Sequence, residues 1–364
     1  MTVKSKSRWL VILIIVSVSI LFVPVTAAAE KHNVNFVALG DSNAFGLSAF
    51  HNPYNRDLTT LNGYNDQFAA SLGVYGTKNY ENFAWPGDKT SDLLNKLYDE
   101  TTAMAVGQAD IITVGIGGNN LLGPSIAAIT GLWGVDPSEY PGDLDGRNMI
   151  SALAEAIVLE YAADTLYDPM DDFMRLMDPS DPAGKAFQAA LTQGMIDFHV
   201  EWPVIAQKIR GLNPRAELYV NTVHNPIQID NPNDLGDPLV PLYLQMESLI
   251  GSFNRTIESY SRMYRYQIVD VKTVFEMTPG SLTFDIAGAL TTAGMIAEYI
   301  LIGADPDQIL ILQLLQQTDP HPTYIGHVAA YELLVEVRET RKPARPMWPA
   351  RSPRSPRSPV FGWW

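Results

Sequence analysis

The chain contains no cysteine. Its absence excludes disulfide bonds, thiolate metal sites and a cysteine nucleophile. It does not fix the compartment, because oxidising environments permit disulfides without requiring them. Also missing are His-Glu-x-x-His, the phosphate-binding Gly-x-x-x-x-Gly-Lys-Ser/Thr and the Gly-x-Ser-x-Gly elbow. Zinc-peptidase, nucleotide-phosphate and ordinary α/β-hydrolase chemistry are therefore disfavoured. Gly115-Ile116-Gly117-Gly118 begins like a dinucleotide-binding loop but lacks the final glycine at the required spacing.

Basic residues are scarce: the chain has 25 Lys and Arg against 40 Asp and Glu, a net charge of −15. The body from Glu30 to Val337 is more acidic still, because the residues before it carry +3 and those after it +6. An acidic body argues against nucleic acid as a partner. Since 46% of the residues are hydrophobic, a sizeable core is expected.

The two ends differ from this body. Three basic residues precede an apolar run from Trp9 to Val25, and Ala27-Ala28-Ala29 follows. This pattern predicts a secretory signal peptide over 1–29 that is cleaved after Ala29, with an uncleaved membrane anchor as the alternative. We expect 338–364, rich in Pro, Arg and Ser, to be a disordered tail.

Apolar runs typical of strands alternate with helical patterns between residues 30 and 337. Strands are expected at 36–39, 80–84, 110–115, 217–223 and 266–271, and helices at 64–72, from 90, at 198–209, 242–263 and 324–335. This alternation predicts one α/β domain with a parallel, doubly wound sheet. The alternation of strand and helix patterns is interrupted at about 123–194 and 275–316, which we interpret as two helical insertions.

The first strand runs directly into Gly40-Asp41-Ser42-Asn43. A serine at the carboxyl end of a strand lies where open α/β sheets bind ligands. Its hydroxyl is a weak nucleophile unless another group removes the proton. Ser42 therefore requires a histidine and an oxyanion hole elsewhere in the chain.

Four blocks, in order along the chain, supply these parts and resemble the SGNH, or GDSL, hydrolases. They are Gly40-Asp41-Ser42-Asn43, the segment ending at Gly87, Gly117-Gly118-Asn119-Asn120, and His321-Pro322-Thr323. The resemblance covers most of the chain after residue 29. It implies a flavodoxin-like three-layer α/β/α fold with a mostly parallel five-stranded sheet.

The resemblance also implies a role for each block. Ser42 would be the nucleophile, and His321 the general base, with Asp319 as the acid that orients it. The backbone N–H groups of Ser42 and Gly87 and the side-chain amide of Asn119 would form the oxyanion hole. No metal or cofactor is required.

The sequence departs from the family at three positions. The orienting acid usually stands three residues before the histidine, where this chain has Thr318, and Asp319 stands two before. A backbone carbonyl could orient His321 instead, which would leave a Ser–His dyad. Asn120 replaces an aspartate that is usually structural, and Asn43 stands where leucine is common.

The remaining histidines lack the support that Pro322 and the following helix give His321. His32, His51, His199 and His224 are therefore poor candidates for the base, and His327, near one turn along that helix, is expected to pack or cap.

The expected function is a secreted serine esterase or lipase that acts on a small-molecule or lipid ester, as a monomer, with transient contact with a lipid surface. A polysaccharide deacetylase on the same fold and a non-catalytic SGNH-like binding protein are the alternatives. The apolar segment Leu290–Leu315 could supply an acyl groove through Ile309, Leu312 and Leu315, or belong to the ordinary core.

Overall fold

The structure is a computed structural model, and the chain divides after Val34. The fold below is that of the unit that begins at Asn35. The described residues are 34–47, 63–132, 158, 174–227, 229, 232–234, 239–282, 286–301, 310, 313, 314, 317 and 321–340. The predicted signal peptide, residues 133–157 and 159–173 of the first predicted insertion, Asp319 and the tail from residue 341 lie outside them.

Five strands form one parallel sheet in the order β2-β1-β3-β4-β5. The strands are β1 Phe36–Gly40, β2 Tyr80–Asn82, β3 Ile111–Gly115, β4 Glu217–Asn221 and β5 Gln267–Val269. All five lie where the apolar runs predict them. The order is that of flavodoxin-like folds, so the predicted fold class is confirmed.

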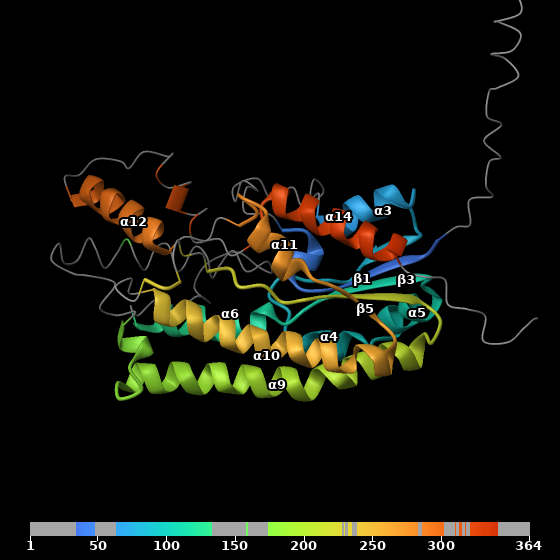
Figure 1. The fold of residues 1–364 in the computed structure, drawn as a ribbon, viewed down its shortest axis with the longest axis horizontal. Helices are drawn as coiled ribbons and strands as arrows, with labels where there is room; N and C mark the ends of the chain where they lie inside the picture. The colour runs from blue at the N-terminus through green and yellow to red at the C-terminus, as the bar shows by residue number, and fades with distance from the viewer. Residues whose placement is uncertain are drawn as a thin grey trace, which may run out of the picture. The chain divides into compact units, whose positions relative to one another are not determined.

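Helices cover both faces of this sheet (Figure 1). They are α2 Ser42–Phe45, α3 Tyr64–Ser71, α4 Thr90–Lys96, α5 Glu100–Gln108, α6 Gly118–Leu132, α9 Pro182–Leu212, α10 Val240–Tyr264, α11 Val271–Met277, α12 Ile286–Leu301 and α14 Tyr324–Thr340. Helices α3 and α14 lie over one face, and α4, α9 and α10 lie over the other. Within the described part of the chain, no helix is long and apolar enough to cross a membrane.

The strand pleat divides the side chains between these two layers. On β3, Ile112 and Val114 point into the main apolar core, which α9 and α10 complete. Thr113 points to the other face, where its hydroxyl donates to Asn65 of α3 at 2.8 Å. The hydroxyl of Thr113 and the side-chain amide of Asn65 are both buried, and each supplies the other's hydrogen-bond partner on this face of the sheet.

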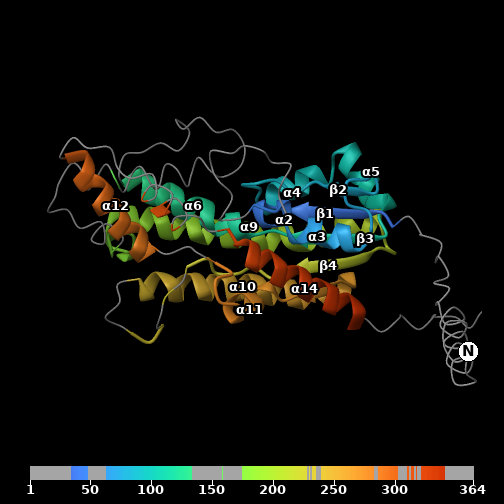
Figure 2. The ribbon, with the colours of Figure 1, turned by 90° about the horizontal axis from the view of Figure 1, so that it is seen from above.

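Helix α9 is one continuous helix from Pro182 to Leu212. The sequence pattern predicted this helix only from about Phe198, so its predicted start was wrong. A Cβ at Gly194 would lie 1.9 Å from the carbonyl oxygen of Asn120. The glycine therefore permits the close packing of α6 on α9 seen in Figure 2, and does not mark a loop.

The C-terminal helix also runs further than the pattern indicates. Helix α14 continues to Thr340, and Arg338 donates to the carboxylate of Glu217 at 3.2 Å. The first three residues assigned to the tail are therefore helical, because this contact ties them to the start of β4.

The strand order reverses between β1 and β3. At such a point the following segments leave toward opposite faces and open a crevice at the carboxyl ends of the strands. Ser42 follows β1 and Asn119 follows β3, so the fold brings these two predicted residues to one crevice.

Candidate active site

Ser42 is held at the first turn of α2 by its neighbours. The carboxylate of Asp41 caps the helix and accepts from the N–H of Asn43 at 3.0 Å. The N–H of Asp41 donates to the carbonyl of Gly115 at 3.0 Å, which joins the end of β1 to the end of β3. Ser42 is 6% exposed, and as the first helical residue its N–H has no acceptor within the helix. That N–H is free to serve an oxyanion.

Gly40 makes this turn sterically feasible. Its φ is +140°, and a Cβ there would lie 1.9 Å from the carbonyl oxygen of Gly115. Any other residue would push β1 and β3 apart below the serine. The sequence break at Gly40 thus corresponds to a close backbone contact.

The second and third blocks meet through side-chain amides. The Nδ2 of Asn119 donates to the carbonyl of Asp88 at 3.1 Å. Asn120 exchanges two hydrogen bonds with Thr90, of 2.8 Å from its Nδ2 and 3.1 Å to its Oδ1. An amide nitrogen has two hydrogens, so Asn119 is oriented by one and keeps the other for a ligand. Asn120 joins α6 to α4, which explains how asparagine can serve where the family usually has aspartate.

Gly87 stands beside this junction with φ +87°, a conformation that glycine favours. It is not among the residues that line the pocket described below, so the structure brings it close to Asn119 only through Asp88. Asp88 itself accepts from Lys96 at 2.5 Å. Burial raises the pKa of Asp88 to about 6, against the lowering effect of that lysine.

His321 lies on a loop that is fastened to the segment after α11. Pro322 pairs with Leu282, the N–H of Thr323 donates to the carbonyl of Ser281 at 2.8 Å, and the Thr323 hydroxyl donates to the carbonyl of Gly280 at 2.6 Å. His321 is 7% exposed. The rigid support predicted for His321 is present, whereas Asp319 lies outside the described residues.

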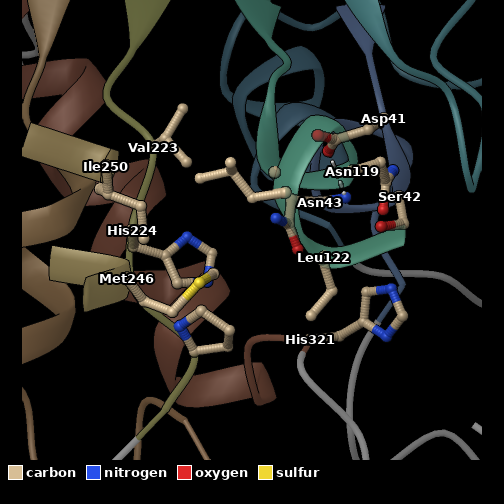
Figure 3. A pocket seen from close by; sticks show the side chains of 13 residues that line it. Asp41, Ser42, Asn43, Asn119, Leu122, Val223, His224, Met246, Ile250 and His321 are labelled. Carbon is tan, nitrogen blue, oxygen red and sulfur yellow. Dashed lines mark hydrogen bonds between the residues drawn. The ribbon is translucent and has the colours of Figure 1, made fainter. Parts of the chain in front are cut away.

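Ser42, Asn119 and His321 line one pocket of about 440 Å³. Figure 3 shows Ser42 and His321 on one side of it, and Val223, His224, Met246 and Ile250 on the other. We call these the near side and the far side. Three of the predicted site residues thus meet, although they come from segments far apart in the sequence.

Asp41 also lines the near side and is almost fully buried. Burial raises the pKa of this carboxyl to about 7, and the neighbouring Asp88 raises it further, while the N–H of Asn43 and the charge of His321 lower it. The charge of His321 therefore acts on Asp41 within the near side of the pocket.

Sequence reasoning missed the far side. His224 was set aside as a base, yet it lines the pocket, and Pro226 and two residues of α10 lie beside it. The sequence position of His224 could have indicated its place in the pocket, since His224 follows β4 at the carboxyl edge of the sheet. The α10 residues could not be found this way, because the helical pattern does not say which buried residue borders a cavity.

The three residues predicted to line an acyl groove, Ile309, Leu312 and Leu315, lie outside the described residues. Their neighbour Leu314 is buried in the core. His327 packs, as expected: its Nε2 is 2.6 Å from the Leu47 carbonyl oxygen, its ring stacks on Tyr64, and burial lowers its pKa to about 4. No group of three or more metal-ligating side chains lies together among the described residues.

No family model and no curated protein matches this sequence. Solved structures do match. An extracellular lipase from Streptomyces rimosus is 16% identical over 84% of this chain and 99% of its own, with a TM-score of 0.44. A lipase from a goat rumen metagenome is 16% identical over 84% and 97%, with a TM-score of 0.41.

Phospholipase A1 from Streptomyces albidoflavus is 16% identical over 68% of this chain and 82% of its own, with a TM-score of 0.38. At such identities and TM-scores, these likenesses add nothing to what the chain's own residues indicate about function.

Proposed function

We propose that this chain is a secreted serine esterase or lipase of the SGNH, or GDSL, type, which hydrolyses carboxylic esters through an acyl-enzyme on Ser42. One observation carries the proposal: Ser42, Asn119 and His321 come from three distant segments and line a single pocket. Each has the chemistry that ester hydrolysis needs at such a place.

In the first half of the reaction, His321 takes the proton of the Ser42 hydroxyl as the oxygen attacks the ester carbonyl. The carbonyl oxygen becomes an oxyanion, which the N–H groups of Ser42 and Gly87 and the amide of Asn119 stabilise. When the tetrahedral intermediate collapses, the C–O bond to the alcohol breaks and His321 gives the proton to the leaving oxygen. The acyl group is then bound to Ser42.

In the second half, water replaces the alcohol. His321 takes a proton from the water as it attacks the acyl carbon, and the bond to Ser42 breaks when His321 returns the proton to the serine oxygen. The carboxylic acid leaves, and the enzyme regains its starting state without a metal or cofactor.

Two arrangements could orient His321. Asp319 could accept the other ring N–H in a Ser–His–Asp triad, or a backbone carbonyl could do so in a dyad. We favour the triad because an ionised partner stabilises the imidazolium more strongly than a carbonyl does. The choice leaves the roles of Ser42 and His321 unchanged.

A panel of p-nitrophenyl esters from acetate to long chains tests the proposal and its alternatives. Turnover that rises with chain length supports a lipase or esterase, because an apolar pocket gains about 0.8 kcal/mol per buried CH₂. Turnover of acetate alone would indicate the polysaccharide deacetylase. Absence of turnover on every ester would indicate the binding protein and would overturn the proposal.

The proposal that the protein is secreted is supported only by the signal-peptide pattern at the N-terminus. Expression of the full chain in a secreting host should release a protein whose first residue is Glu30. Retention of an intact N-terminus in the membrane fraction would favour the anchor instead.

A further inference from the structure

His224 is a buried polar residue that the proposed reaction does not use. It is 9% exposed and lies on the far side of the pocket, across from Ser42 (Figure 3). Its ring packs edge to face against Phe275, with centroids 4.8 Å apart and planes at 84°. This contact holds the ring in place but uses neither nitrogen.

Within the part of the chain that the structure describes, neither ring nitrogen of His224 has a hydrogen-bond partner, and neither is among the sealed, unpartnered polar atoms. Neither nitrogen is therefore fully sealed, and His224 lines the pocket. Leaving a buried polar group unpaired is costly. A ligand that fills the pocket excludes water from these nitrogens, and it avoids this cost only if it supplies a partner.

The protonation state of His224 limits what that partner can be. Burial lowers its pKa to about 3, and the charges of His321, His327 and Lys272 act in the same direction. At neutral pH the imidazole is uncharged, with one N–H donor and one nitrogen acceptor. Lys272 is itself paired with Glu247, at 3.1 Å, and with Glu276. Among the described residues, this side of the pocket thus offers no free positive charge to a phosphate or carboxylate.

The neighbours of His224 on the far side of the pocket are apolar: Val223, Pro226, Met246 and Ile250. A plain hydrocarbon chain would satisfy these four residues but would leave His224 unpaired. A chain or headgroup with one hydroxyl would suit these four residues and also pair one ring nitrogen of His224, because a hydroxyl can either donate or accept.

We propose that His224 forms a hydrogen bond with an uncharged hydroxyl of the ester substrate, so that the enzyme prefers hydroxylated esters to plain ones. This inference rests on the proposed function and adds a substrate class to it. The hydroxyl could belong to a hydroxyacyl chain or to a partly esterified polyol such as glycerol, and the test has one arm for each.

The experiment measures kcat/KM for methyl octanoate, methyl 3-hydroxyoctanoate and 1-octanoylglycerol. Wild-type enzyme should favour one of the two hydroxylated esters over methyl octanoate, and the favoured one identifies the source of the hydroxyl. His224→Phe keeps the ring that packs on Phe275 and removes both nitrogens. It should lower kcat/KM for the favoured ester about tenfold more than it lowers kcat/KM for methyl octanoate, the upper range for one neutral hydrogen bond.

Two further variants separate recognition from folding. His224→Gln keeps a donor and an acceptor and should restore part of the preference. His199→Phe replaces a half-buried histidine of α9 that bonds to Met195 and Ser252 outside the pocket, and should leave the preference unchanged. Thermal unfolding of each variant reports whether it folds.

Binding to Ser42→Ala, measured by calorimetry with the same three esters, keeps the test independent of turnover. The hydroxylated ester should bind more tightly than methyl octanoate, and His224→Phe in that background should remove the difference. If no ester is turned over yet this difference is found, the proposed function fails and the recognition by His224 stands. Equal kcat/KM or equal binding for plain and hydroxylated esters in the wild-type pocket would overturn the inference, whatever the variants do.

Discussion

The near and far sides of the pocket are built in different ways. On the near side, backbone and side-chain hydrogen bonds join the ends of β1 and β3 and the starts of α4 and α6 around Ser42 and Asn119. On the far side, Met246 and Ile250 are held by apolar packing, and His224 has no hydrogen bond among the described residues. The first construction fixes directions, as the stabilisation of charge requires. The second has two hydrogen bonds, between the backbone of Val223 and Asn254 of α10, and otherwise fixes a shape, which suits the selection of substrates.

The largest effect should come from the nucleophile. Ser42→Ala removes only one oxygen, so the fold should be retained while kcat falls about 10⁶-fold, as in a well-studied serine hydrolase. Steady-state kinetics with p-nitrophenyl butyrate, and unfolding curves for both proteins, check this. Full activity in the variant would end the assignment of Ser42.

The next largest effect on kcat should come from the residue that orients His321. If Asp319 orients His321, Asp319→Asn should lower kcat by about 10⁴, as neutralisation of a triad aspartate does elsewhere. A loss within about tenfold would instead assign the orientation of the ring to a backbone carbonyl. The same kinetic assay separates the two outcomes.

Asn119→Ala should cost about 10² to 10³ in kcat with KM nearly unchanged, because its amide acts on charge that exists only in the transition state. Asn120→Ala is the informative comparison. It breaks the bonds to Thr90 and should lower thermal stability more than kcat. An effect of Asn119→Ala confined to KM would mean that Asn119 binds substrate without stabilising the oxyanion.

Asp41→Asn should lower kcat by about tenfold, because the charge beside His321 is lost, and yet raise stability. The folded-state pKa of about 7 is above the ordinary value of 3.8. Between these pH values the folded protein holds a proton that the unfolded chain has lost, so stability falls as pH rises through this window. Asparagine also caps helices well. The gain in Tm should therefore be greatest above pH 7 and vanish below about pH 4.

Asp181→Asn is the control for this prediction. Asp181 caps α9, but the N–H of Ala183 lowers the pKa of its carboxyl. Its replacement should give no such gain at high pH. Equal stability of wild type and Asp41→Asn at pH 8 would contradict the account of a strained buried carboxylate.

The smallest effect should come from the far side. Met246→Ala should reduce the preference for octanoate over acetate by about three- to tenfold, because it removes apolar contact with a longer chain. Val200→Ala, at an exposed position on α9, should leave the ratio unchanged. A Met246→Ala variant that slows both esters equally would show that Met246 only supports the fold.

The same contrast explains what the sequence could predict. The central strands are found because runs such as Ile111–Gly115 are buried on both faces and therefore mostly apolar. The near side is found because chain order and strand ends place Ser42 and Asn119 together. The far side depends on how α10 packs, which the sequence pattern does not reveal. The start of α9 was misplaced because the sequence alone does not distinguish a glycine in a close helix–helix contact from a glycine in a turn.

The most direct test of the central claim is labelling with a fluorophosphonate probe, followed by peptide mass spectrometry. A serine is phosphonylated at a useful rate only where a base and an oxyanion hole serve it. We predict one adduct, on the peptide that contains Ser42, and no adduct in Ser42→Ala. Labelling of another serine, or no labelling of a folded protein that hydrolyses esters, would contradict the claim that Ser42 is the nucleophile.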